Sequence, residues 1–286
     1  MSFNKSFLIN YKIIRLSRIR ELVEYFSPRP VTSIAYFLVS ALIFFKNILI
    51  KNFSYQSRAS KTQSIAYLIA TGPSIKNVDL SKLIGSDVYT VSNFVLHDLC
   101  FDLNPCAHFI AAFHPPLDMD SIDEWLRVID AKLPVGVEIV TDDKNKYFIS
   151  GRHFIGRKVI YIETFPMLDL LFICPPYITP RPWSVPQLAI PYIFSLGYSE
   201  IVLCGCDHTA LASYGEIIKH FYEPDLDVRT GASDILAWQD GGIIKQLRNN
   251  LELFRLYRNM QKYYSKRGKS ISRISADGWL DFIPKK

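Results

Sequence analysis

Polar residues follow four apolar runs of the sequence at the points where these runs end. The turn 70–74 (Ala-Thr-Gly-Pro-Ser) follows the run 64–69, and three further runs, 88–92, 108–113 and 199–204, precede Asn93, His114 and Asp207. A strand that ends in a tight glycine turn before a helix points backbone N–H groups at an anion. The candidate phosphate-binding residues of this turn are therefore Thr71, Gly72, Pro73 and Ser74.

The apolar runs alternate with helical patterns along residues 61–286. Further strands are expected at 137–141, 158–162 and 270–275, and helices at 187–197 and 243–267. This alternation predicts an α/β fold, a Rossmann-like, mainly parallel sheet flanked by helices. Ligands bind outside the carboxyl ends of the strands in such sheets, so the four strand-end groups are expected to meet there.

Three other segments carry weaker signals. Residues 165–186 are rich in proline and aromatics and are expected to be mostly loop or lid. In the last helix one face is formed by Ile244, Leu247, Leu251, Phe254 and Tyr257. Four acidic residues lie close together, which could suggest a metal site: Asp118, Asp120, Asp123 and Glu124. A solvated helix start is favoured instead, because acidic side chains stabilise the first turn of a helix.

The first sixty residues differ from the rest. The chain has a net charge of +6, and its excess of lysine and arginine lies in residues 1–61 beside apolar residues. Residues 5–26 predict an interfacial helix, and the uncharged run 31–45 is shorter than the about 20 residues a membrane span needs. Residues 1–60 are therefore expected to be a helical anchor that contacts a membrane surface through residues 5–50. Packing of these two segments on residues 61–286 is the alternative.

Composition argues against several kinds of protein. The basic residues are interleaved with apolar ones in helical order, so nucleic acid is not expected as a partner. The chain has five cysteines without a C-x-x-C pair, which disfavours a disulfide framework or a zinc site and fits a reducing cytoplasm. We expect these cysteines to be small buried hydrophobic residues.

The order of short motifs resembles the bacterial sialyltransferase-like glycosyltransferases. This group includes lipo-oligosaccharide sialyltransferases that use CMP-sialic acid, motility accessory factors and pterin diphosphokinase-like proteins. The matching motifs span about 64–282: the turn 70–74 with Asp79, the segment 92–94, Arg181 with Ser184, the stretch 196–207 (Leu-Gly-Tyr to Gly-x-Asp) and the segment 220–222 (His-Phe-Tyr).

The sequence also departs from the sialyltransferase pattern. Thr71 and His114 stand where asparagines are expected, and Thr209 replaces one of two phosphate-facing tyrosines, while Tyr214 matches the other. The resemblance thus supports a nucleotide-sugar enzyme more firmly than CMP-sialic acid as the donor.

The resemblance implies an inverting glycosyltransferase without metal or cofactor, acting at the cytoplasmic face of the inner membrane on a glycan or glycolipid acceptor. His220 is the implied general base, and Tyr214 and Tyr222 would donate to the leaving phosphate. The implied donor-binding residues are Thr71, Gly72, Pro73, Ser74, Asn93, His114, Arg181, Ser184, Asp207 and His208.

Several alternatives remain open at the level of sequence. His114 and His208 compete with His220 for the role of base, and Asp207 could instead cap the next turn. Magnesium-dependent diphosphate transfer is a second enzymatic reading, and a non-catalytic, membrane-bound nucleotide-binding protein is a third. A homo-oligomer is compatible with the resemblance, and the sequence does not decide it.

Overall fold

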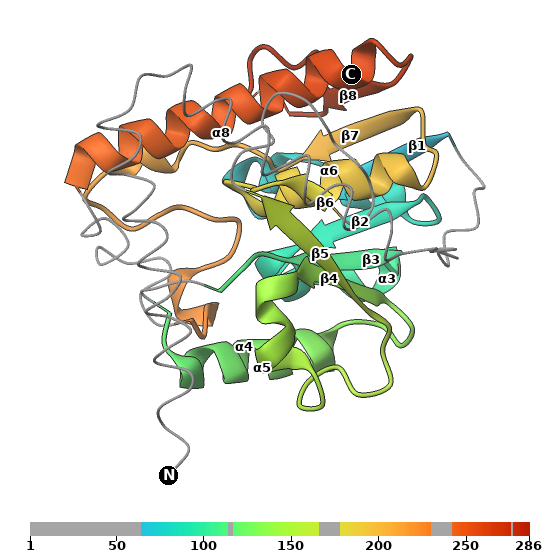
Figure 1. The fold of residues 1–286 in the computed structure, drawn as a ribbon, viewed down its shortest axis with the longest axis vertical. Helices are drawn as coiled ribbons and strands as arrows, with labels where there is room; N and C mark the ends of the chain where they lie inside the picture. The colour runs from blue at the N-terminus through green and yellow to red at the C-terminus, as the bar shows by residue number, and fades with distance from the viewer. Residues whose placement is uncertain (1–63, 114–116, 166–177, 230–241, 276) are drawn as a thin grey trace. The chain divides into compact units, whose positions relative to one another are not determined.

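The computed structural model describes residues 64–113, 117–165, 178–229, 242–275 and 277–286. Its centre is an eight-stranded sheet with the order β6-β5-β4-β3-β2-β1-β7-β8, and every neighbouring pair is parallel (Figure 1). The strands are β1 Ile65–Ile69, β2 Val88–Val91, β3 Ala107–Ile110, β4 Glu138–Asp142, β5 Val159–Phe165, β6 Ile178–Pro180, β7 Glu200–Cys204 and β8 Ser270–Arg273.

The described helices are α3 Cys100–Leu103, α4 Met119–Lys132, α5 Lys146–Ile149, α6 Val185–Ser195 and α8 Gly242–Ser265. Short 3₁₀ helices follow several strands: η1 Pro73–Asn77, η2 Leu80–Leu83, η3 Ser92–Leu96, η4 Asp143–Asn145, η5 Ala210–Ser213 and η6 Pro224–Leu226. The predicted α/β fold with a parallel sheet is confirmed for the part of the chain that these elements cover.

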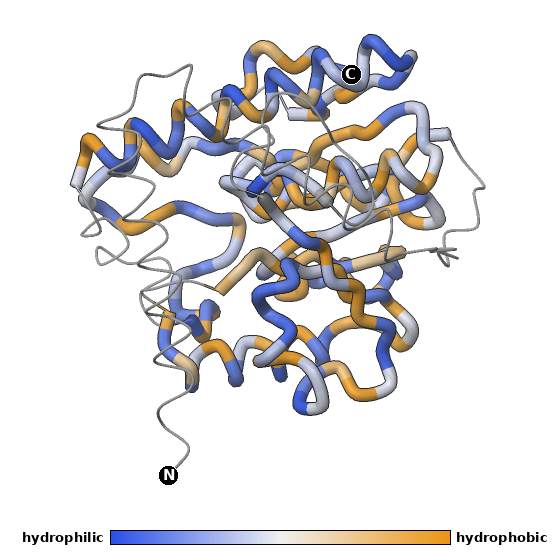
Figure 2. Tube along the Cα trace, in the orientation of Figure 1, coloured by the Kyte–Doolittle hydropathy of each residue, from blue (hydrophilic) through white to orange (hydrophobic). Residues whose placement is uncertain are grey.

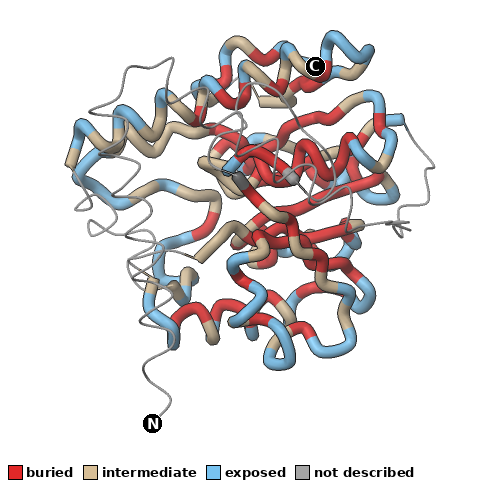
Figure 3. Tube along the Cα trace, viewed as in Figure 1, coloured by how far each residue is buried: buried red, intermediate tan, exposed pale blue. Residues whose placement is uncertain are grey.

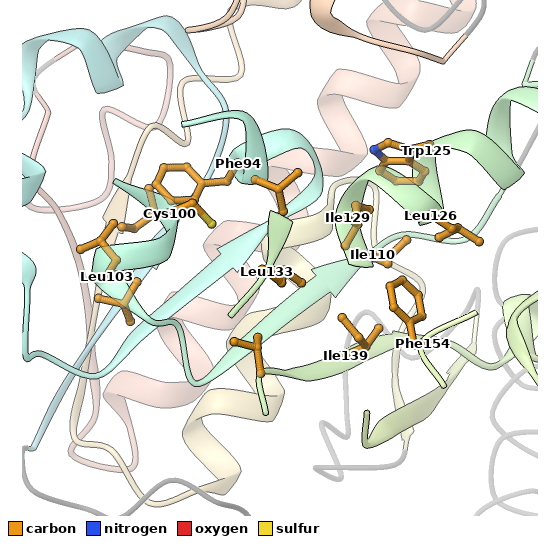
Figure 4. Packing of buried hydrophobic residues seen from close by; sticks show 14 of the residues in the cluster. Phe94, Cys100, Leu103, Ile110, Trp125, Leu126, Ile129, Leu133, Ile139 and Phe154 are labelled. Carbon is orange, nitrogen blue, oxygen red and sulfur yellow. The ribbon is translucent and has the colours of Figure 1, made fainter. Parts of the chain in front are cut away.

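The central strands are buried over their whole length, because helices pack on both faces of the sheet. All residues of β2, β3 and β4 are buried, as Figure 3 shows for the middle of the sheet. Near-continuous apolar runs are what strands covered on both faces require. On one face Trp125, Leu126 and Ile129 of α4 pack with Ile110 and Ile139 (Figure 4).

Helix α6 is apolar almost all round and continues through Pro191. Its buried Gln187 donates from Nε2 to the carbonyl of Leu253 at 2.8 Å and accepts from the Trp183 N–H at 2.9 Å. A buried amide is tolerated when its hydrogen bonds are made, and here they connect the start of α6 to α8.

Two sequence predictions were wrong in detail. The segment 165–186 is not mostly loop where it is described, since β5 runs to Phe165 and β6 (Ile178–Pro180) pairs with it. Pro180 is tolerated because β6 is an edge strand. The helix implied after the glycine turn 70–74 is instead the two 3₁₀ helices η1 and η2, separated by Val78 in an extended conformation.

The predicted apolar face of the last helix was also wrong for its first three members. Ile244, Leu247 and Leu251 are exposed by 74%, 53% and 57%. Helix α8 instead packs through a different set: Leu253, Leu256, Tyr257, Met260 and Tyr264. Apolar residues thus lie along α8 on more than its packed side, as the alternation of colours in Figure 2 indicates.

The predicted membrane anchor, 1–60, lies outside the described residues, and its role stays a prediction. Within the described ranges, none of the helices combines the length and the apolar character that crossing a bilayer requires. Cys100, Cys204 and Cys206 are free and buried, as expected for small hydrophobic residues, and Cys106 is free and partly buried. The pKa values of the Cys100 and Cys204 thiols are raised to about 12 by burial.

Candidate active site

The order of the strands places a topological switch point between β1 and β7. From β1 the chain continues to β2 on one side, whereas β7 and β8 lie on the other side. The two strand-end turns that flank this point are joined by backbone bonds, from Ala70 N–H to the Cys204 carbonyl at 2.8 Å and from Gly72 N–H to the Gly205 carbonyl at 2.9 Å. Ligands of open parallel sheets bind at such a point.

Gly72 is required by the close approach of the two turns. A Cβ atom at this position would lie 2.5 Å from Asp207 Oδ2 and 2.5 Å from the Gly205 carbonyl oxygen. The backbone of Gly72 has φ −66°, which any residue can adopt, so space and not conformation demands glycine here. Gly205 adds a positive φ of 65° on the other turn.

The carboxylate of Asp207 lies at the turn 70–74, where the sequence predicted an anionic ligand. Its carboxylate is 5% exposed and accepts from the Ser74 N–H at 2.8 Å and from the Ser74 hydroxyl at 2.5 Å. Burial raises the pKa of Asp207, and the two bonds from Ser74 oppose that shift. Asp207 thus caps the turn that follows β1, and not the next turn along the chain as the capping alternative had it.

The prediction that the β1 turn offers its amides to a phosphate was wrong for three of its N–H groups. Gly72 donates to Gly205, Ser74 donates to Asp207, and Ile75 donates back to the Gly72 carbonyl at 3.2 Å. Pro73 has no N–H to give. The Asp207 carboxylate satisfies one of these three N–H groups and backbone carbonyls satisfy the other two, so none of the three is free to bind a phosphate.

The segment 220–222 lies directly against this turn. Phe221 N–H donates to the Thr71 carbonyl at 3.2 Å. The His220 ring stacks on the Tyr222 ring with centroids 4.9 Å apart and planes 7° apart. Burial lowers the pKa of His220, and Arg229 lowers it further, while Asp227 raises it. A neutral imidazole at neutral pH is the form that can accept a proton.

Tyr222 connects the predicted base segment to Asn93. The Tyr222 hydroxyl accepts from Asn93 Nδ2 at 3.0 Å and donates to Asp227 Oδ2 at 3.2 Å. Asn93 Oδ1 in turn accepts from Trp125 Nε1 at 2.5 Å. Asn93 and Tyr222 are 2% and 6% exposed. Burial raises the pKa of Tyr222, so its hydroxyl keeps its proton and remains a hydrogen-bond donor.

Sequence reasoning missed an ion pair beneath these residues. Arg229 donates to Asp227 through Nε at 2.8 Å and Nη2 at 2.6 Å, in side-on, bidentate geometry. The Arg229 guanidinium lies 4.6 Å from the Trp125 ring centroid, and its Nη1 lies 3.4 Å from Ser92 Oγ. The side chains of Arg229 and Asp227 are 13% and 1% exposed.

The ion pair between Asp227 and Arg229 changes the pKa of the Asp227 carboxyl. Burial alone would raise the pKa of Asp227, but the Arg229 guanidinium overcomes it and lowers that pKa to about 2. The pair is therefore fully ionised at neutral pH. In the sequence, this ion pair is visible only as the spacing Asp-x-Arg at 227–229. That spacing belongs to no motif that predicts a buried ion pair.

A second group of predicted residues meets at Tyr257 of α8. His208 Nε2 lies 2.9 Å from the Tyr257 hydroxyl, and Ser184 Oγ lies 3.4 Å from it. Burial lowers the pKa of His208 to about 4. Tyr257 is completely buried and was expected only as a helix-face residue. His208 directly follows Asp207, so the two groups of site residues adjoin at the end of β7.

The remaining predicted residues are placed as follows. Arg181 is exposed, and its guanidinium lies 5.9 Å from the Trp183 ring centroid. Tyr214 follows η5 and is 40% exposed. His114 lies outside the described residues, so its predicted role stays untested. The partly exposed residues of the site are Thr71, Gly72, Pro73, Ser184, His208 and His220, whereas Ser74, Asn93 and Asp207 lie beneath them.

Two residues of this region hold a left-handed backbone although they are not glycine. Ser92, just before Asn93, has φ 52°, and His208, just after Asp207, has φ 53°. Such residues cost of order 1–3 kcal/mol each and concentrate at functional sites. Both occur at carboxyl ends of strands, next to residues that the sequence singled out.

A cavity of about 690 Å³ lies elsewhere, between α4 and the loop that precedes β5. It is lined by Asp123, Arg127, Asp130, Arg152, His153 and Ile155 among others. These residues are separate from the strand ends described above. No group of three or more His, Cys, Asp or Glu side chains could hold a metal ion within the described part of the chain. Independence from metal stays a prediction.

Neither a known protein family nor a curated protein matches the sequence. Solved structures do match. The monofunctional α-2,3-sialyltransferase Cst-I from Campylobacter jejuni is 16% identical, with a TM-score of 0.46, and the match covers 82% of this chain and 83% of that one.

Two further solved structures show a similar degree of likeness. The sialyltransferase CST-II, in complex with a trisaccharide acceptor and CMP, is 15% identical over 77% of this chain and 85% of that chain, with a TM-score of 0.43. CstII from Campylobacter jejuni, in complex with CMP as a substrate analogue, is 17% identical over 77% and 84%, with a TM-score of 0.42. The chain is thus similar to solved sialyltransferases at low sequence identity.

Proposed function

We propose that this protein is an inverting, metal-independent glycosyltransferase that transfers a sugar from a nucleotide donor to a surface glycan or lipo-oligosaccharide. A CMP-linked nonulosonic acid, or a similar acidic sugar, is the first choice of donor, from the motif resemblance. The observation that carries the proposal is the bond between Phe221 and Thr71, because it holds His220 against the turn at the switch point.

The proposed reaction needs one base and a held donor. The acceptor oxygen forms a bond to the anomeric carbon from the face opposite the nucleotide phosphate, and the bond from that carbon to the phosphate oxygen breaks. The neutral imidazole of His220 takes the acceptor hydroxyl proton, and the electron pair of the broken bond leaves with the nucleotide. Attack from the opposite face inverts the anomeric centre.

Side chains, not turn amides, are the proposed donor contacts. Asp207 accepts from two groups of the first turn, the N–H and the hydroxyl of Ser74, so the proposed donor contacts are the Thr71 hydroxyl and the exposed side chains of Arg181 and Tyr214. Arg181 suits a carboxylate or a phosphate, and Tyr214 suits the leaving phosphate oxygen. Asn93 contributes as a buried group that fixes Tyr222 beneath the base.

His220 suits the role of base better than His208. The Nε2 atom of His208 is engaged with the Tyr257 hydroxyl, and its pKa of about 4 makes it a weak proton acceptor. His220 is partly exposed, and its ring is held on the Tyr222 ring. Efficient general bases have pKa values near the working pH, and the pKa of about 4 for His208 lies well below it.

A thermal-shift panel tests the donor class. Purified full-length protein is heated with CMP, CDP, UDP, GDP and ADP compounds in separate samples. A ligand at about 100 times its dissociation constant stabilises the fold by about 2.7 kcal/mol, so one nucleotide class should respond strongly. We expect CMP compounds to respond. A dominant response to another nucleotide would reassign the donor, and no response to any of them would contradict the proposal.

Turnover with and without EDTA separates the alternatives. Magnesium-dependent diphosphate transfer loses its activity in EDTA, whereas the proposed sugar transfer keeps it. A protein that binds nucleotide but neither transfers nor hydrolyses a donor would be the non-catalytic alternative. Attachment to the cytoplasmic face of the inner membrane through residues 5–50 is part of the same proposal.

A further inference from the structure

Helix α8 carries an exposed apolar stripe opposite its packed side. Ile243, Ile244, Leu247 and Leu251 are exposed by 41%, 74%, 53% and 57%. Residues three, four and seven positions apart share one face of an α-helix, so these four form a continuous stripe. The packed side of α8 is formed by its second half, around Tyr257. The stripe therefore has no partner among the described residues of the domain.

Cations continue and flank the same stripe. Arg258 lies seven residues after Leu251, and Lys262 follows one turn later, so both extend the stripe toward the end of the helix. Arg248 and Arg255 lie along its edge, and all four cations are exposed. The α8 sequence contains one acidic residue, Glu252, which pairs with Arg255 at 2.8 Å. The exposed side of α8 is thus apolar at its start and basic beyond.

The apolar half of α8 lies at the end of the domain that carries the site. The helix precedes β8, which is parallel to β7, so its Gly242 end is near the carboxyl ends of the strands. Figure 1 shows this end of α8 extending past the arrowheads of β5 and β7. The middle of the helix reaches the site itself, since the Tyr257 hydroxyl lies 2.9 Å from His208 Nε2.

We propose that the α8 face, formed by Ile243, Ile244, Leu247, Leu251, Arg248, Arg258 and Lys262, docks on an anionic membrane surface. The apolar side chains would enter the headgroup boundary, and the cations would meet lipid phosphates, which is how interfacial amphipathic helices bind. This contact is distinct from the one expected through residues 5–50. If the proposed function holds, α8 also brings the sugar-transfer site to an acceptor carried by lipid.

Charge favours lipid over a second copy of the chain. A two-fold contact would place the α8 face against itself, which brings cations together and offers only Glu252, already paired, to neutralise them. An anionic bilayer supplies the missing negative charge along the whole face. The apolar side chains of the α8 face can contact the hydrocarbon boundary of such a surface, and its cations can contact the lipid phosphates.

Vesicle partition of the full chain tests the proposal. Phosphatidylcholine vesicles with and without phosphatidylglycerol are sedimented with wild-type protein and with Arg258→Gln/Lys262→Gln. We expect partition to the anionic vesicles to weaken about fivefold for each cation removed at low salt. The matched control is Lys82→Gln/Lys132→Gln, which removes two exposed lysines elsewhere and should leave partition unchanged. Equal partition of both variants and wild type would overturn the proposal.

A depth measurement addresses the apolar stripe directly. The fluorescence of Leu247→Trp should be quenched by vesicles with brominated acyl chains, whereas that of Val135→Trp, at a residue 93% exposed in the loop between α4 and β4, should not. Equal quenching at both sites would contradict docking through α8. If Leu247→Glu lowers the mass of the protein in solution, a second copy of the chain occupies the α8 face. That result would also overturn the proposal. The nucleotide thermal shift should persist in every variant, so loss of docking and failure of the proposed function remain distinguishable.

Discussion

The imidazole of His220 lies parallel to the phenol of Tyr222, with ring centroids 4.9 Å apart, and the far end of that phenol is bonded to Asn93 and Asp227. The orientation of the proposed base therefore depends on a buried polar network that reaches η3 through Asn93 and α4 through Trp125. Networks of this kind fix a side chain when every member is satisfied.

His220→Ala should lower kcat of sugar transfer by about 10²–10⁴-fold, because the acceptor hydroxyl loses its general base. His208→Ala should act on KM more than on kcat, since His208 adjoins the donor region but is engaged with Tyr257. Steady-state kinetics of both purified variants check this. Full kcat in His220→Ala would remove the assigned base, and a large kcat loss confined to His208→Ala would exchange the roles.

Single substitutions in the Asp227–Arg229 pair should shift the acid limb of the pH–rate profile in opposite directions. The base works when deprotonated, so activity falls as pH drops through the pKa of His220. Arg229 lowers that pKa, and its replacement by Gln should move the limb to higher pH. Asp227 raises it, so Asp227→Asn should move the limb to lower pH. The profile of kcat/KM against pH measures both shifts.

The double variant Asp227→Asn/Arg229→Gln is the control for this test. Removal of one member of a buried ion pair costs about 3–5 kcal/mol, because the other charge is left unpaired, and removal of both avoids that penalty. The double variant should therefore be more stable than either single variant in urea, with an acid limb between theirs. Parallel shifts in both single variants would indicate a general loss of packing instead.

Gly72→Ala should destabilise the fold by about 1–3 kcal/mol, since its Cβ would overlap Asp207 Oδ2 and the Gly205 carbonyl. Ser74→Ala should cost about 1.5–3 kcal/mol, because a buried carboxylate loses a donor. Urea unfolding measures both. Ser81→Ala removes a comparable bond to the exposed Asp79 and should cost far less. Equal costs at Ser74 and Ser81 would argue against a buried Asp207 cap.

The protein should lose stability below pH 6.5 through two neutral histidines, the buried His108 and the partly exposed His208. Burial lowers the pKa of His108 to about 3 and that of His208 to about 4. Both lie below the unfolded value of about 6.5, so their contribution is complete above that pH and is lost as pH falls toward the folded values. Each histidine should lower the free energy of unfolding by about 2 kcal/mol between pH 7 and pH 5.

His108→Asn isolates one of these contributions. His108 is fully buried, its Nδ1 lies 2.9 Å from Thr90 Oγ1, and its Nε2 has no partner among the described residues. The variant should show a shallower dependence of unfolding free energy on pH, by about one proton. Urea titrations at several pH values measure this slope. An identical slope in wild type and variant would show that His108 does not titrate as its burial requires.

Local patterns were enough to predict the parallel sheet and the polar ends of its strands. Buried strands read as short apolar runs, and parallel strands place their ends together, so Thr71, Asn93 and Asp207 could be assigned to one edge before any coordinates. The same reasoning failed at β6, whose three residues carry too short a pattern, and on α8, where two apolar faces share one helix.

Contacts between distant parts of the chain decided the rest. Ser74 and Asp207 are 133 positions apart, and only the register of β1 against β7 brings that carboxylate onto the turn that was expected to hold an anion. The Asp227–Arg229 pair reaches Asn93 through Tyr222, again across more than a hundred positions. Periodicity reports which way a side chain faces, because it depends on neighbours along the chain. Which atom it meets depends on strand register and helix packing, and these are properties of the folded molecule.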